Sequence, residues 1–468
     1  MTEQSSGQSS EQGIEARIAD RVGAQRDSIR ADLERLARIP SVSVPTFDQS
    51  HVEASAELVA DLLRASGMPE VEILRVGPPQ APVAGAPAVV ARRPAPPGAP
   101  TVLLYAHHDV QPPGSEDGWT TPAFEPTERD GRLFGRGCAD DKAGICVHLA
   151  ALRALGDDLG VGVTVFVEGE EEIGSPSFEA FLQTYHDRLA ADVIVIADST
   201  NWQVGVPALT TSLRGLVDGE IRVSTLDHAL HSGMFGGAVP DATTALIKLL
   251  ATFWDDDGAV AVENLPTGTP APDGVAQYTE AEVRADAAML DGARLVGRGS
   301  LAERLWSGPA LSVLATDLPG LGQASNTLAA SATVKFSLRV PPGAEPAACL
   351  EAIAEHTRRH VPWGASVEVL PGETGSPWTG DVANEVYAVA RRSLERAWGT
   401  PPVYMGVGGS IPFIAALQKV YPEAVVLVTG VEDPDSRAHG HDESLHLGEF
   451  ERACVAEALL LAGLAGTR

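Results

Sequence analysis

The chain has 468 residues, of which 44% are hydrophobic and 21% charged, as is typical of a folded protein with more than one domain. Its 34 Lys and Arg residues face 63 Asp and Glu residues, and the resulting net charge of −29 disfavours nucleic acid and anionic membranes as partners. No segment approaches the roughly 20 consecutive apolar residues that a membrane-spanning helix needs.

The N-terminal sequence MTEQSSGQSSEQG is polar, and it lacks the basic and apolar regions of a secretory signal. We expect a disordered tail there. The four cysteines form no CxxC pair, which suits a reducing compartment and excludes a cysteine-rich zinc module. These features predict a cytoplasmic protein. Cys138 lies close to the site described below, but its neighbours do not indicate a nucleophile.

The first 200 residues predict a parallel α/β arrangement. Helices are expected over 14–38, before Pro40, and over 51–66, before Gly67. The Pro-, Gly- and Ala-rich stretch 77–100 is expected to be a surface excursion containing a short AVVARR strand. Strands and helices then alternate, which is typical of βαβ units. The strands are 101–105, 163–167 and 192–197, and the helices are 141–155 and 176–187.

The pattern changes near residue 208 to β-α-β-β-α-β, a split βαβ sandwich. Its elements are strand 213–224, helix 241–254, strands 310–317 and 331–340, helix 346–360 and strand 365–370. Residues 255–307 interrupt it as an insertion for which we have no functional interpretation. The α/β pattern returns from about 373, with helices 382–397, 411–419 and 447–463 and strand 424–428.

These elements predict an α/β protein. Its catalytic domain has a mixed, mostly parallel sheet and is formed by residues 14–208 and 373–468. An α+β domain of split βαβ, ferredoxin-like order is inserted between them at residues 209–372.

Four apolar, strand-like runs each lead into residues that bind divalent metals. In an open α/β sheet, ligands bind beyond the carboxyl ends of the strands. Gathering His, Asp and Glu at a buried edge is costly unless a cation neutralises them. The residues that follow the four runs are His107 and Asp109; Glu168, Glu170, Glu171 and Glu172; Asp198; and His439, His441 and Glu443. The sequence therefore predicts a metal site at this edge.

The HHD segment at 107–109 extends the first run. Alternate residues of an extended segment share a face, so His107 and Asp109 point together and His108 points away. A carboxylate beside a ligand His fixes its orientation. We therefore interpret His107 as a ligand, Asp109 as its partner and His108 as structural.

Two acidic motifs complete the predicted site. GRGCADDKAG opens the predicted helix at 141, where a single Asp would be an N-cap. Two successive Asp residues are more than a cap needs. Asp140 is therefore a candidate bridging ligand, and Asp141 is left to cap the helix or to orient a ligand. EGEEEIGS follows a fully apolar strand, which argues against a solvated acidic turn. A hydrolytic metal site needs one carboxylate on the metal and another to take the proton of water, and the adjacent Glu171 and Glu172 fit these two tasks.

The motifs YAHHDVQP, GRGCADDKAG, EGEEEIGS, Asp198, HSGMFGG, GGSIP and AHGHDE, in this order, resemble the M20 family of di-zinc aminoacylase and carboxypeptidase-like metallopeptidases. Within that family, the chain is most similar to the dipeptidase branch that includes carnosinases. The resemblance spans roughly residues 30–460. It implies a catalytic α/β domain that holds two metal ions. It also implies an inserted lid domain that mediates homodimerisation.

The resemblance assigns the metal ligands. One metal would lie on His107, Asp140 and Asp198, and the other on Asp140, Glu172 and His439, with Asp140 bridging. Glu171 matches the general base. The family usually has a cis peptide at the DDK step, here between Asp140 and Asp141.

The resemblance also assigns residues of the inserted domain and the substrate loop. His231, in HSG, matches the lid histidine that reaches the partner subunit's site and stabilises the oxyanion. Arg339 matches the arginine that holds the substrate carboxylate. Gly409 and Ser410, in GGSIP, match a substrate-binding loop.

The chain departs from the family pattern near the last ligand, where AHGHDE replaces the usual AHxPNE. Alignment on Glu443 selects His439 as the ligand, with His441 as a close competitor. The family's DDKGG or DDKGP step reads DDKAG here. His228, three residues before His231, is interpreted as structural.

The leading functional prediction is a cytoplasmic, homodimeric dipeptidase that acts on very short peptides with a free C-terminal carboxylate. Zinc is the first expectation for a His and carboxylate site with an open position, and manganese or cobalt are alternatives. A second hypothesis is an N-acyl-amino-acid deacylase or carbamoyl amidohydrolase with the same site. A third is a catalytically silent scaffold, which would have lost a ligand or the base, whereas every expected position is filled here.

Overall fold

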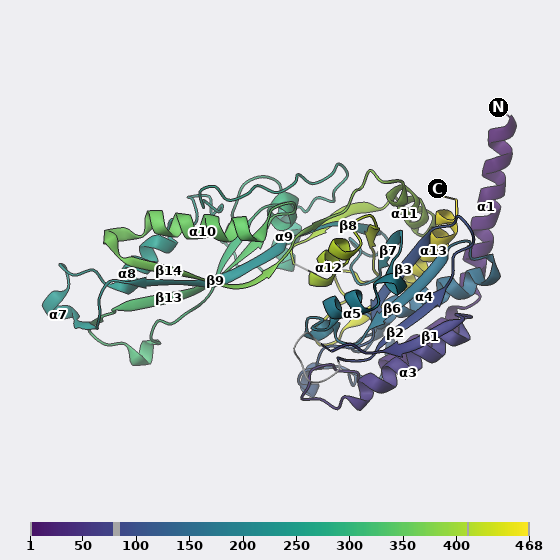
Figure 1. Ribbon diagram of the computed structural model, residues 1–468, viewed down its shortest axis with the longest axis horizontal. Coiled ribbons are helices and arrows are strands. Elements are labelled where there is room, and N and C mark those ends of the chain that lie inside the picture. The colour runs from purple at the N-terminus through teal and green to yellow at the C-terminus, as the bar shows by residue number, and fades with distance from the viewer. Residues whose placement is uncertain (1, 78–84, 410, 467–468) are drawn as a thin grey trace. The chain divides into compact units, whose positions relative to one another are not determined.

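The computed structural model describes residues 2–77, 85–409 and 411–466, and it divides into two compact units (Figure 1). The first is formed by the chain up to Thr211, by Gly380–Tyr404 and by the chain from Ala416 onward; the second is formed by Ser212–Thr379 and Met405–Ala415. The domain boundaries 14–208, 209–372 and 373–468 stay a prediction. The second compact unit also takes Met405–Ala415, which lies in the segment predicted for the catalytic domain.

The first unit is built on a twisted mixed sheet whose centre is parallel. β3 pairs in parallel with β6 and β7, and β7 with β17, whereas the outer pairs β1–β2 and β2–β6 are antiparallel. The prediction of a mixed, mostly parallel central sheet is confirmed. The strands, in spatial order, are β1 Glu70–Leu74, β2 Ala88–Arg93, β6 Gly162–Glu168, β3 Thr101–His107, β7 Val193–Ile196 and β17 Val425–Val428. β17 also meets β8 (Ala208–Leu213) in an antiparallel contact.

One local prediction is wrong in this sheet. The AVVARR segment is not part of a surface excursion, because β2 lies between β1 and β6 and its first four residues are buried. Pro and Gly on both sides of the segment suggested a loop. The pairing of β2 with β6 over Val89–Arg93 overrides that local signal.

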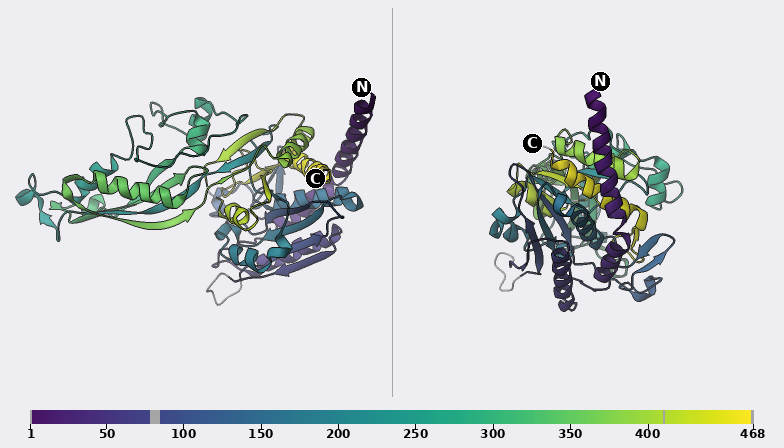
Figure 2. Two further views of the ribbon diagram at one scale, coloured as in Figure 1. Left: turned by 45° about the horizontal axis from the view of Figure 1, so that its top comes forward. Right: turned by 90° about the vertical axis from the view of Figure 1, so that its right-hand side faces the viewer.

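Helices cover the sheet of the first unit (Figures 1 and 2). α4 packs on β3 and against α13 and α2, and α3 packs on β1 and β2. The apolar sequences of α4 and α13 are buried along nearly their whole length. Their bounds are α2 Arg26–Ala37, α3 Ser50–Ala65, α4 Lys142–Leu155, α5 Phe178–Thr184, α6 His186–Leu189, α11 Glu385–Trp398, α12 Pro412–Val420 and α13 Leu447–Leu464.

The N-terminal region differs from its prediction in two ways. The polar tail is helical, because α1 spans Thr2–Gly23. Ile18 and Val22 are buried, so tertiary contact forms the costly nucleus of this helix, and each further turn then costs little. The predicted helix 14–38 is also two helices, since α1 ends at Gly23 and α2 begins at Arg26. Glycine is a poor helix former, which suits the break.

The second unit contains an antiparallel sheet of order β11-β13-β9-β14. In chain order its elements are β9 Gly215–Ser224, α8 Ala242–Leu250, β11 Ala310–Thr316, β13 Ser331–Val340, α10 Pro346–His360 and β14 Ser366–Gly375, which is β-α-β-β-α-β. Buried and exposed residues alternate along β9 and β13, as expected for a sheet with one covered face. α8 and α10 pack on that sheet, and Phe336, Leu246 and Ile353 belong to the shared core.

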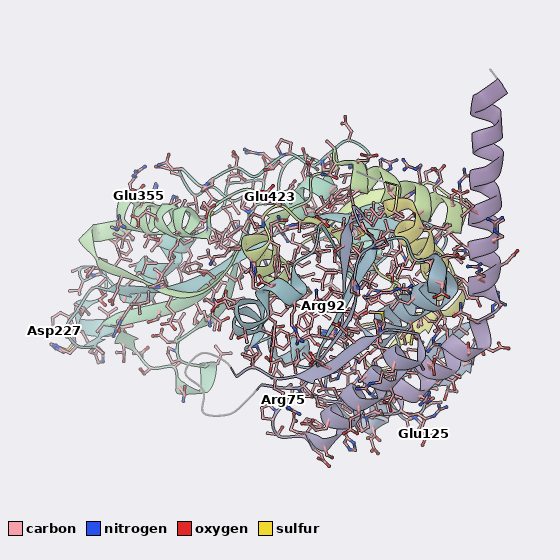
Figure 3. All side chains as sticks on the ribbon, turned by 45° about the vertical axis from the view of Figure 1, so that its right-hand side comes forward. Arg75, Arg92, Glu125, Asp227, Glu355 and Glu423 are labelled. Carbon is pink, nitrogen blue, oxygen red and sulfur yellow. The ribbon has the colours of Figure 1, made fainter. Side chains whose placement is uncertain are left out.

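The acidic composition appears on the surface. Figure 3 shows charged side chains such as Asp227, Glu355 and Glu423 projecting outward, and all three residues are exposed. Among the helices of the described residues, none is long and apolar enough to cross a membrane.

Candidate metal centre

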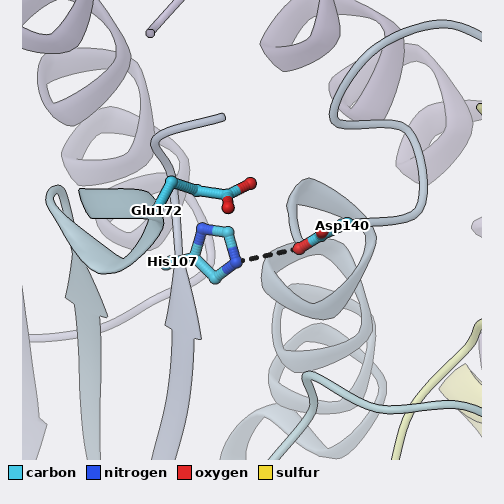
Figure 4. Close-up of side chains that lie close together, drawn as sticks. All are labelled: His107, Asp140 and Glu172. Carbon is cyan, nitrogen blue, oxygen red and sulfur yellow. Dashed lines mark hydrogen bonds and ion pairs between the residues drawn. The ribbon is translucent and has the colours of Figure 1, made fainter. Parts of the chain in front are cut away.

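His107 stands at the carboxyl end of β3, which is buried along all but its first residue. Its Nε2 atom lies 3.0 Å from Asp140 Oδ1 and 3.8 Å from Asp198 Oδ2. Asp198 follows β7, the parallel neighbour of β3, so the pairing of these strands brings the two side chains to one edge. Figure 4 shows His107, Asp140 and Glu172 pointing toward one another from three different segments.

Asp140 and Asp141 lie on either side of a cis peptide bond just before α4, as the resemblance implies. Asp141 caps the helix, because its Oδ1 accepts a hydrogen bond from Gly144 N at 3.2 Å, and its Oδ2 accepts one from His107 N at 3.2 Å. Asp140 is free to face the site. Its Oδ1 meets His107, and its Oδ2 lies 3.0 Å from His439 Nε2, so Asp140 stands between two imidazoles as a bridging ligand would.

The next residue, Lys142, is fully buried and points away from the carboxylates. Its Nζ donates to Leu36 O at 2.9 Å and to Ile39 O at 2.8 Å, at the end of α2. The buried ammonium therefore ties the start of α4 to the N-terminal helices.

Glu172 lies in the short turn Glu171–Ile173, which follows β6, and only 2% of its side chain is exposed. Its Oε2 is 3.2 Å from His439 Nε2. Gln111 donates to the Glu172 carboxylate twice, from its backbone N at 3.1 Å and from Nε2 at 2.8 Å, and its Nε2 also lies 3.1 Å from the backbone O of Glu172. Gln111 was not singled out from the sequence, although it lies in the YAHHDVQP motif.

Asp109 lies beneath this turn and is fully buried. Its Oδ1 accepts from Glu171 N at 3.2 Å, and its Oδ2 accepts from Glu172 N at 3.0 Å. The Nδ1 atom of His107 is 3.1 Å from the backbone O of Asp109 and 3.4 Å from its Oδ1. Asp109 thus holds His107 and the turn of Glu171 and Glu172 in one arrangement.

The structure separates the two histidines of AHGHDE. His439 faces Asp140 and Glu172, whereas the ring of His441 packs edge-on against Trp119, with centroids 6.1 Å apart. A Cβ atom on Gly118 would lie 2.5 Å from the His441 ring, so this packing needs glycine at that position. His441 therefore belongs to the wall of the site and not to its ligands.

A buried ion pair that was missed from the sequence positions Asp140. Arg136 Nη1 donates to Glu443 Oε2 at 2.6 Å, and both residues are buried. Glu443 Oε1 accepts from Ala139 N at 3.0 Å and from Asp140 N at 3.2 Å. Because Arg136 Nη2 also donates to Gly440 O at 3.1 Å, the pair joins the loop of Asp140 to the loop of His439.

His108 points away from this cluster. It is buried, its Nε2 lies 2.8 Å from Pro87 O, and burial lowers its pKa to about 4. This placement agrees with a structural role. His228, also interpreted as structural, is exposed and forms an ion pair with its neighbour Asp227.

The charges of the site are unbalanced. Burial, together with the nearby carboxylates of Asp140 and Glu172, raises the pKa of Asp198 to about 7 against the opposing effect of His107. Glu432, a carboxyl that the sequence did not single out, has its pKa raised well above the ordinary value by burial and by Asp140 and Asp198. In the described part of the chain, no Lys or Arg side chain pairs with Asp140, Glu172 or Asp198.

This imbalance fits divalent cations. Ligand atoms of His107, Asp140 and Glu172 lie within 4.8 Å of one another, and so do ligand atoms of His107, Asp141 and Asp198. The second group contains Asp141, whereas the prediction has Asp140, which lies beside it. Nitrogen and carboxylate donors together suit zinc and also manganese or cobalt.

Glu171 adjoins the ligands without joining them. Its carboxyl has no hydrogen-bond or ion-pair partner among the described residues, and the residue is half-buried. Burial raises the pKa of Glu171 to about 9, and Asp198 and Glu172 add to this effect while His107 opposes it. A carboxyl that is held in place but uncommitted can accept and return a proton.

The remaining predicted residues belong to the second unit, and their roles stay predictions. His231 precedes α7 (Ser232–Phe235), where its exposed side chain accepts from Gly233 N at 3.0 Å. Arg339 lies on β13 and is half-buried, and Gly409 is half-exposed in the loop after β16 (Val403–Val407). Ser410 lies outside the described residues.

The chain is similar to several known peptidases. It is 37% identical to the cysteinylglycine-S-conjugate dipeptidase of Corynebacterium striatum over 374 residues, and this match covers 78% of this chain and 81% of the relative. It is 28% identical to the Cys-Gly metallodipeptidase dug1 of Schizosaccharomyces pombe, over 92% of this chain and 94% of the relative. It is 29% identical to the human Beta-Ala-His dipeptidase, over 86% and 83%.

Solved structures share the fold. The di-peptidase Dug1p of Saccharomyces cerevisiae superposes with a TM-score of 0.74 at 22% identity and covers 97% of this chain and 99% of its own. Human carnosine dipeptidase 1 superposes with a TM-score of 0.73 at 24% identity, over the same shares of the two chains. The model of peptidase family M20/M25/M40 matches residues 103–462, which include every predicted metal ligand and Glu171. The chain belongs to this peptidase family.

Proposed function

We propose that this M20 peptidase hydrolyses the amide bond of dipeptides or very short peptides that carry a free C-terminal carboxylate. The observation that carries the proposal is the uncommitted Glu171 carboxyl beside a buried, unbalanced cluster of His and carboxylate ligands. The relatives reported above are dipeptidases, which supports the substrate class. We also infer a cytoplasmic location, in keeping with four cysteines that are free and buried.

We propose two divalent metals, with zinc as the first expectation and manganese or cobalt as alternatives. His107, Asp140 and Asp198 would hold one metal, and Asp140, Glu172 and His439 the other. When bound, the metals lower the pKa of a shared water and polarise the scissile carbonyl. Their charge would also offset the repulsion among the carboxylates, which would lower the raised pKa of Glu171.

The protein's own groups then perform the proton transfers. Glu171 accepts the proton of the attacking water and later donates it to the leaving nitrogen. Its position is set by Asp109, which accepts from Glu171 N, and the ligand beside it is set by Gln111. Both supports are buried or half-buried, so the base and the ligand keep their separation during turnover.

The substrate would be oriented by the second unit. Arg339 binds the C-terminal carboxylate, a planar group that suits a guanidinium, with Gly409 and Ser410 beside it. His231 stabilises the oxyanion in the site of a partner subunit, a contribution typically worth about 3–4 kcal/mol. The exposed side chain of His231 is available for this role.

A homodimer is part of this proposal. The edge strand β11 exposes five of its seven residues, and the apolar side chains Val313 and Leu314 are 42% and 56% exposed. Met234, three residues after His231 in the chain, is 76% exposed. An unpaired sheet edge with apolar side chains favours pairing with another copy.

The test is hydrolysis by the metal-stripped protein after reloading with zinc or manganese. The substrates are unblocked dipeptides, the same dipeptides with amidated C-termini, and N-acyl amino acids. Metal-dependent cleavage of free dipeptides that is lost on amidation supports the proposal. Cleavage of the N-acyl compounds alone would replace it with a deacylase that uses the same site, and no turnover with any metal would favour the silent scaffold.

A further inference from the structure

Arg214 in the second unit is a buried cation without a carboxylate partner. It lies between β8 and β9, and the residue is 8% exposed. Its Nε donates to Gly408 O at 3.0 Å, and its Nη1 donates to Arg304 O at 3.3 Å and to Gly308 O at 3.4 Å. Among the described residues, only these backbone carbonyls bind the guanidinium. A buried charge of this kind is costly unless an anion approaches it.

A second arginine lies beside the first. Arg339 on β13 lies directly opposite Leu216 on β9, and Leu216 follows Arg214 by two residues. The two arginines are therefore diagonal neighbours across this strand pair. Within the part of the chain that the structure describes, the Arg339 side chain has neither a hydrogen bond nor an ion pair. Burial lowers the pKa of Arg214 to about 10, and the charge of Arg339 adds to this effect. Two neighbouring cations therefore lack a counter-ion among the residues that the structure describes.

The end of the 255–307 insertion closes around Arg214. A Cβ atom on Gly408 would lie 2.7 Å from Arg214 Nη2 and 3.0 Å from Leu305 O, so a side chain at this position would displace the guanidinium. A Cβ atom on Gly406 would lie 2.6 Å from the Cβ of Trp306, which is buried. The segment 406–408 and the short π-helix Glu303–Ser307 thus contact one another, and both contact Arg214.

We propose that Arg214 is a positioning residue of an anion site centred on Arg339, and that this site takes the free carboxylate of the substrate. Arg214 adds a second positive charge and fixes the Gly408 loop next to Arg339. The insertion contributes by holding the Arg214 guanidinium with two carbonyls. This inference rests on the proposed function and deepens it, because it names the residues that make the enzyme select a free C-terminus.

The experiment compares Arg214→Gln, Arg214→Lys and Arg339→Gln with the wild type, all loaded with metal. The substrates are a free dipeptide and its C-terminal amide, and kcat and KM are measured separately. Arg214→Gln should raise KM for the free dipeptide by about tenfold, because a charge-assisted contact is lost, and it should lower the preference for the free form over the amide by a similar factor. Arg214→Lys keeps the charge but not the three contacts, so it should show a smaller change of the same sign.

Arg284→Gln is the matched control. Arg284 lies in the insertion and also donates to backbone carbonyls, those of Ala293 at 2.7 Å and Leu290 at 3.4 Å, but it is not part of the anion site. It should leave the preference for the free form unchanged. If Arg214→Gln does not fold, Gly408→Ala tests the same point, since its methyl group presses on Nη2 and should raise KM for the free dipeptide.

The outcomes separate the two proposals. An unchanged preference in both Arg214→Gln and Arg214→Lys, with a lost preference in Arg339→Gln, would leave the proposed function intact and overturn this inference. A wild-type enzyme that cleaves the amide as well as the free dipeptide would overturn the free-carboxylate requirement, and this inference with it. A purely structural role for Arg214 would lower stability and kcat for both substrates alike, which also contradicts the inference.

Discussion

The two compact units carry opposite charge imbalances. In the first, Asp140, Glu172 and Asp198 gather with no Lys or Arg partner among the described residues. In the second, Arg214 and Arg339 gather, and no carboxylate of the described residues pairs with either. Each arrangement is unfavourable in the isolated protein and becomes favourable when the missing charge arrives. The comparison teaches that the sign of the missing charge indicates the ligand, which we propose to be a metal cation in one unit and a carboxylate in the other.

The largest expected effect separates base from ligand within the acidic cluster. Glu171→Gln should lower kcat by roughly 10²–10⁴-fold because the proton acceptor is lost, while the metal content stays the same. Glu172→Gln should lose metal. Both are checked by steady-state kinetics together with elemental analysis of the purified proteins. Metal loss in the Glu171 variant but not in the Glu172 variant would reverse the two assignments.

The next largest effect is expected from breaking the buried ion pair of Arg136 and Glu443, which positions Asp140. Glu443→Gln leaves the Arg136 charge buried and unpaired, so the free energy of unfolding should fall by roughly 3–5 kcal/mol. Urea denaturation measures this. Glu451→Gln is the control, because the Glu451 pair with Arg26 is solvent-exposed and should contribute less than about 1 kcal/mol. Equal losses in the two variants would argue against a supporting role for the buried pair.

A smaller effect concerns the orientation of one ligand. Gln111→Ala removes two hydrogen-bond contacts of the Gln111 side chain with Glu172 and should weaken metal binding by about tenfold, measured by competition with a chelator. Gln49→Ala serves as the control, because Gln49 donates only to backbone carbonyls, those of Val42, Val44 and Phe47, and to none of the predicted ligands. Unchanged metal affinity in Gln111→Ala would mean that the backbone alone positions Glu172.

The smallest effect is expected in the pH dependence of stability and comes from the buried pair of His148 and Glu457. His148 Nδ1 lies 2.7 Å from Glu457 Oε1, and Nε2 lies 3.1 Å from Tyr105 O. Burial acts to lower the pKa of His148, but the charge and hydrogen bond of Glu457 raise it above the ordinary value. The pair therefore stabilises the fold fully below the unfolded-state pKa of about 6.5, and this stabilisation is lost as the pH rises through the folded-state pKa.

Unfolding measured across about pH 5 to 9 should thus show a stability decrease toward alkaline pH that His148→Gln lacks. The metal centre also titrates, so both proteins are compared in the metal-free form and only their difference is interpreted. A difference that is independent of pH would contradict a charged His148 in the folded protein.

The ligands that end strands could be predicted because a local pattern fixes them. His107 and Asp198 follow apolar runs that form parallel neighbours, and parallel neighbours deliver their last residues to one edge. Residues that act across long sequence separations could not be predicted this way. Arg136 and Glu443 lie 307 residues apart, and only the folded chain pairs them. Glu432 and Arg214 carry no motif of their own, since their importance arises from neighbours that tertiary packing supplies.

The same reasoning explains the local errors. β2 was assigned to a surface excursion because of its Pro- and Gly-rich flanks, yet sheet pairing decides its place. The polar N-terminal stretch reads as disordered by composition, yet it continues a helix that is anchored further along by Ile18 and Val22. Composition describes a segment in isolation, whereas these segments take their structure from what they contact.

The buried ammonium of Lys142 has a consequence for how this enzyme can be shortened. The family match begins at residue 103, which suggests that the preceding helices could be removed. Lys142, however, follows the Asp140–Asp141 step directly, and its hydrogen-bond acceptors are carbonyls of Leu36 and Ile39. Removing the first 40 residues would leave the buried Lys142 amine without these two acceptors, directly after the Asp140–Asp141 step. The smallest active fragment is therefore expected to include α2 and the residues up to Ile39.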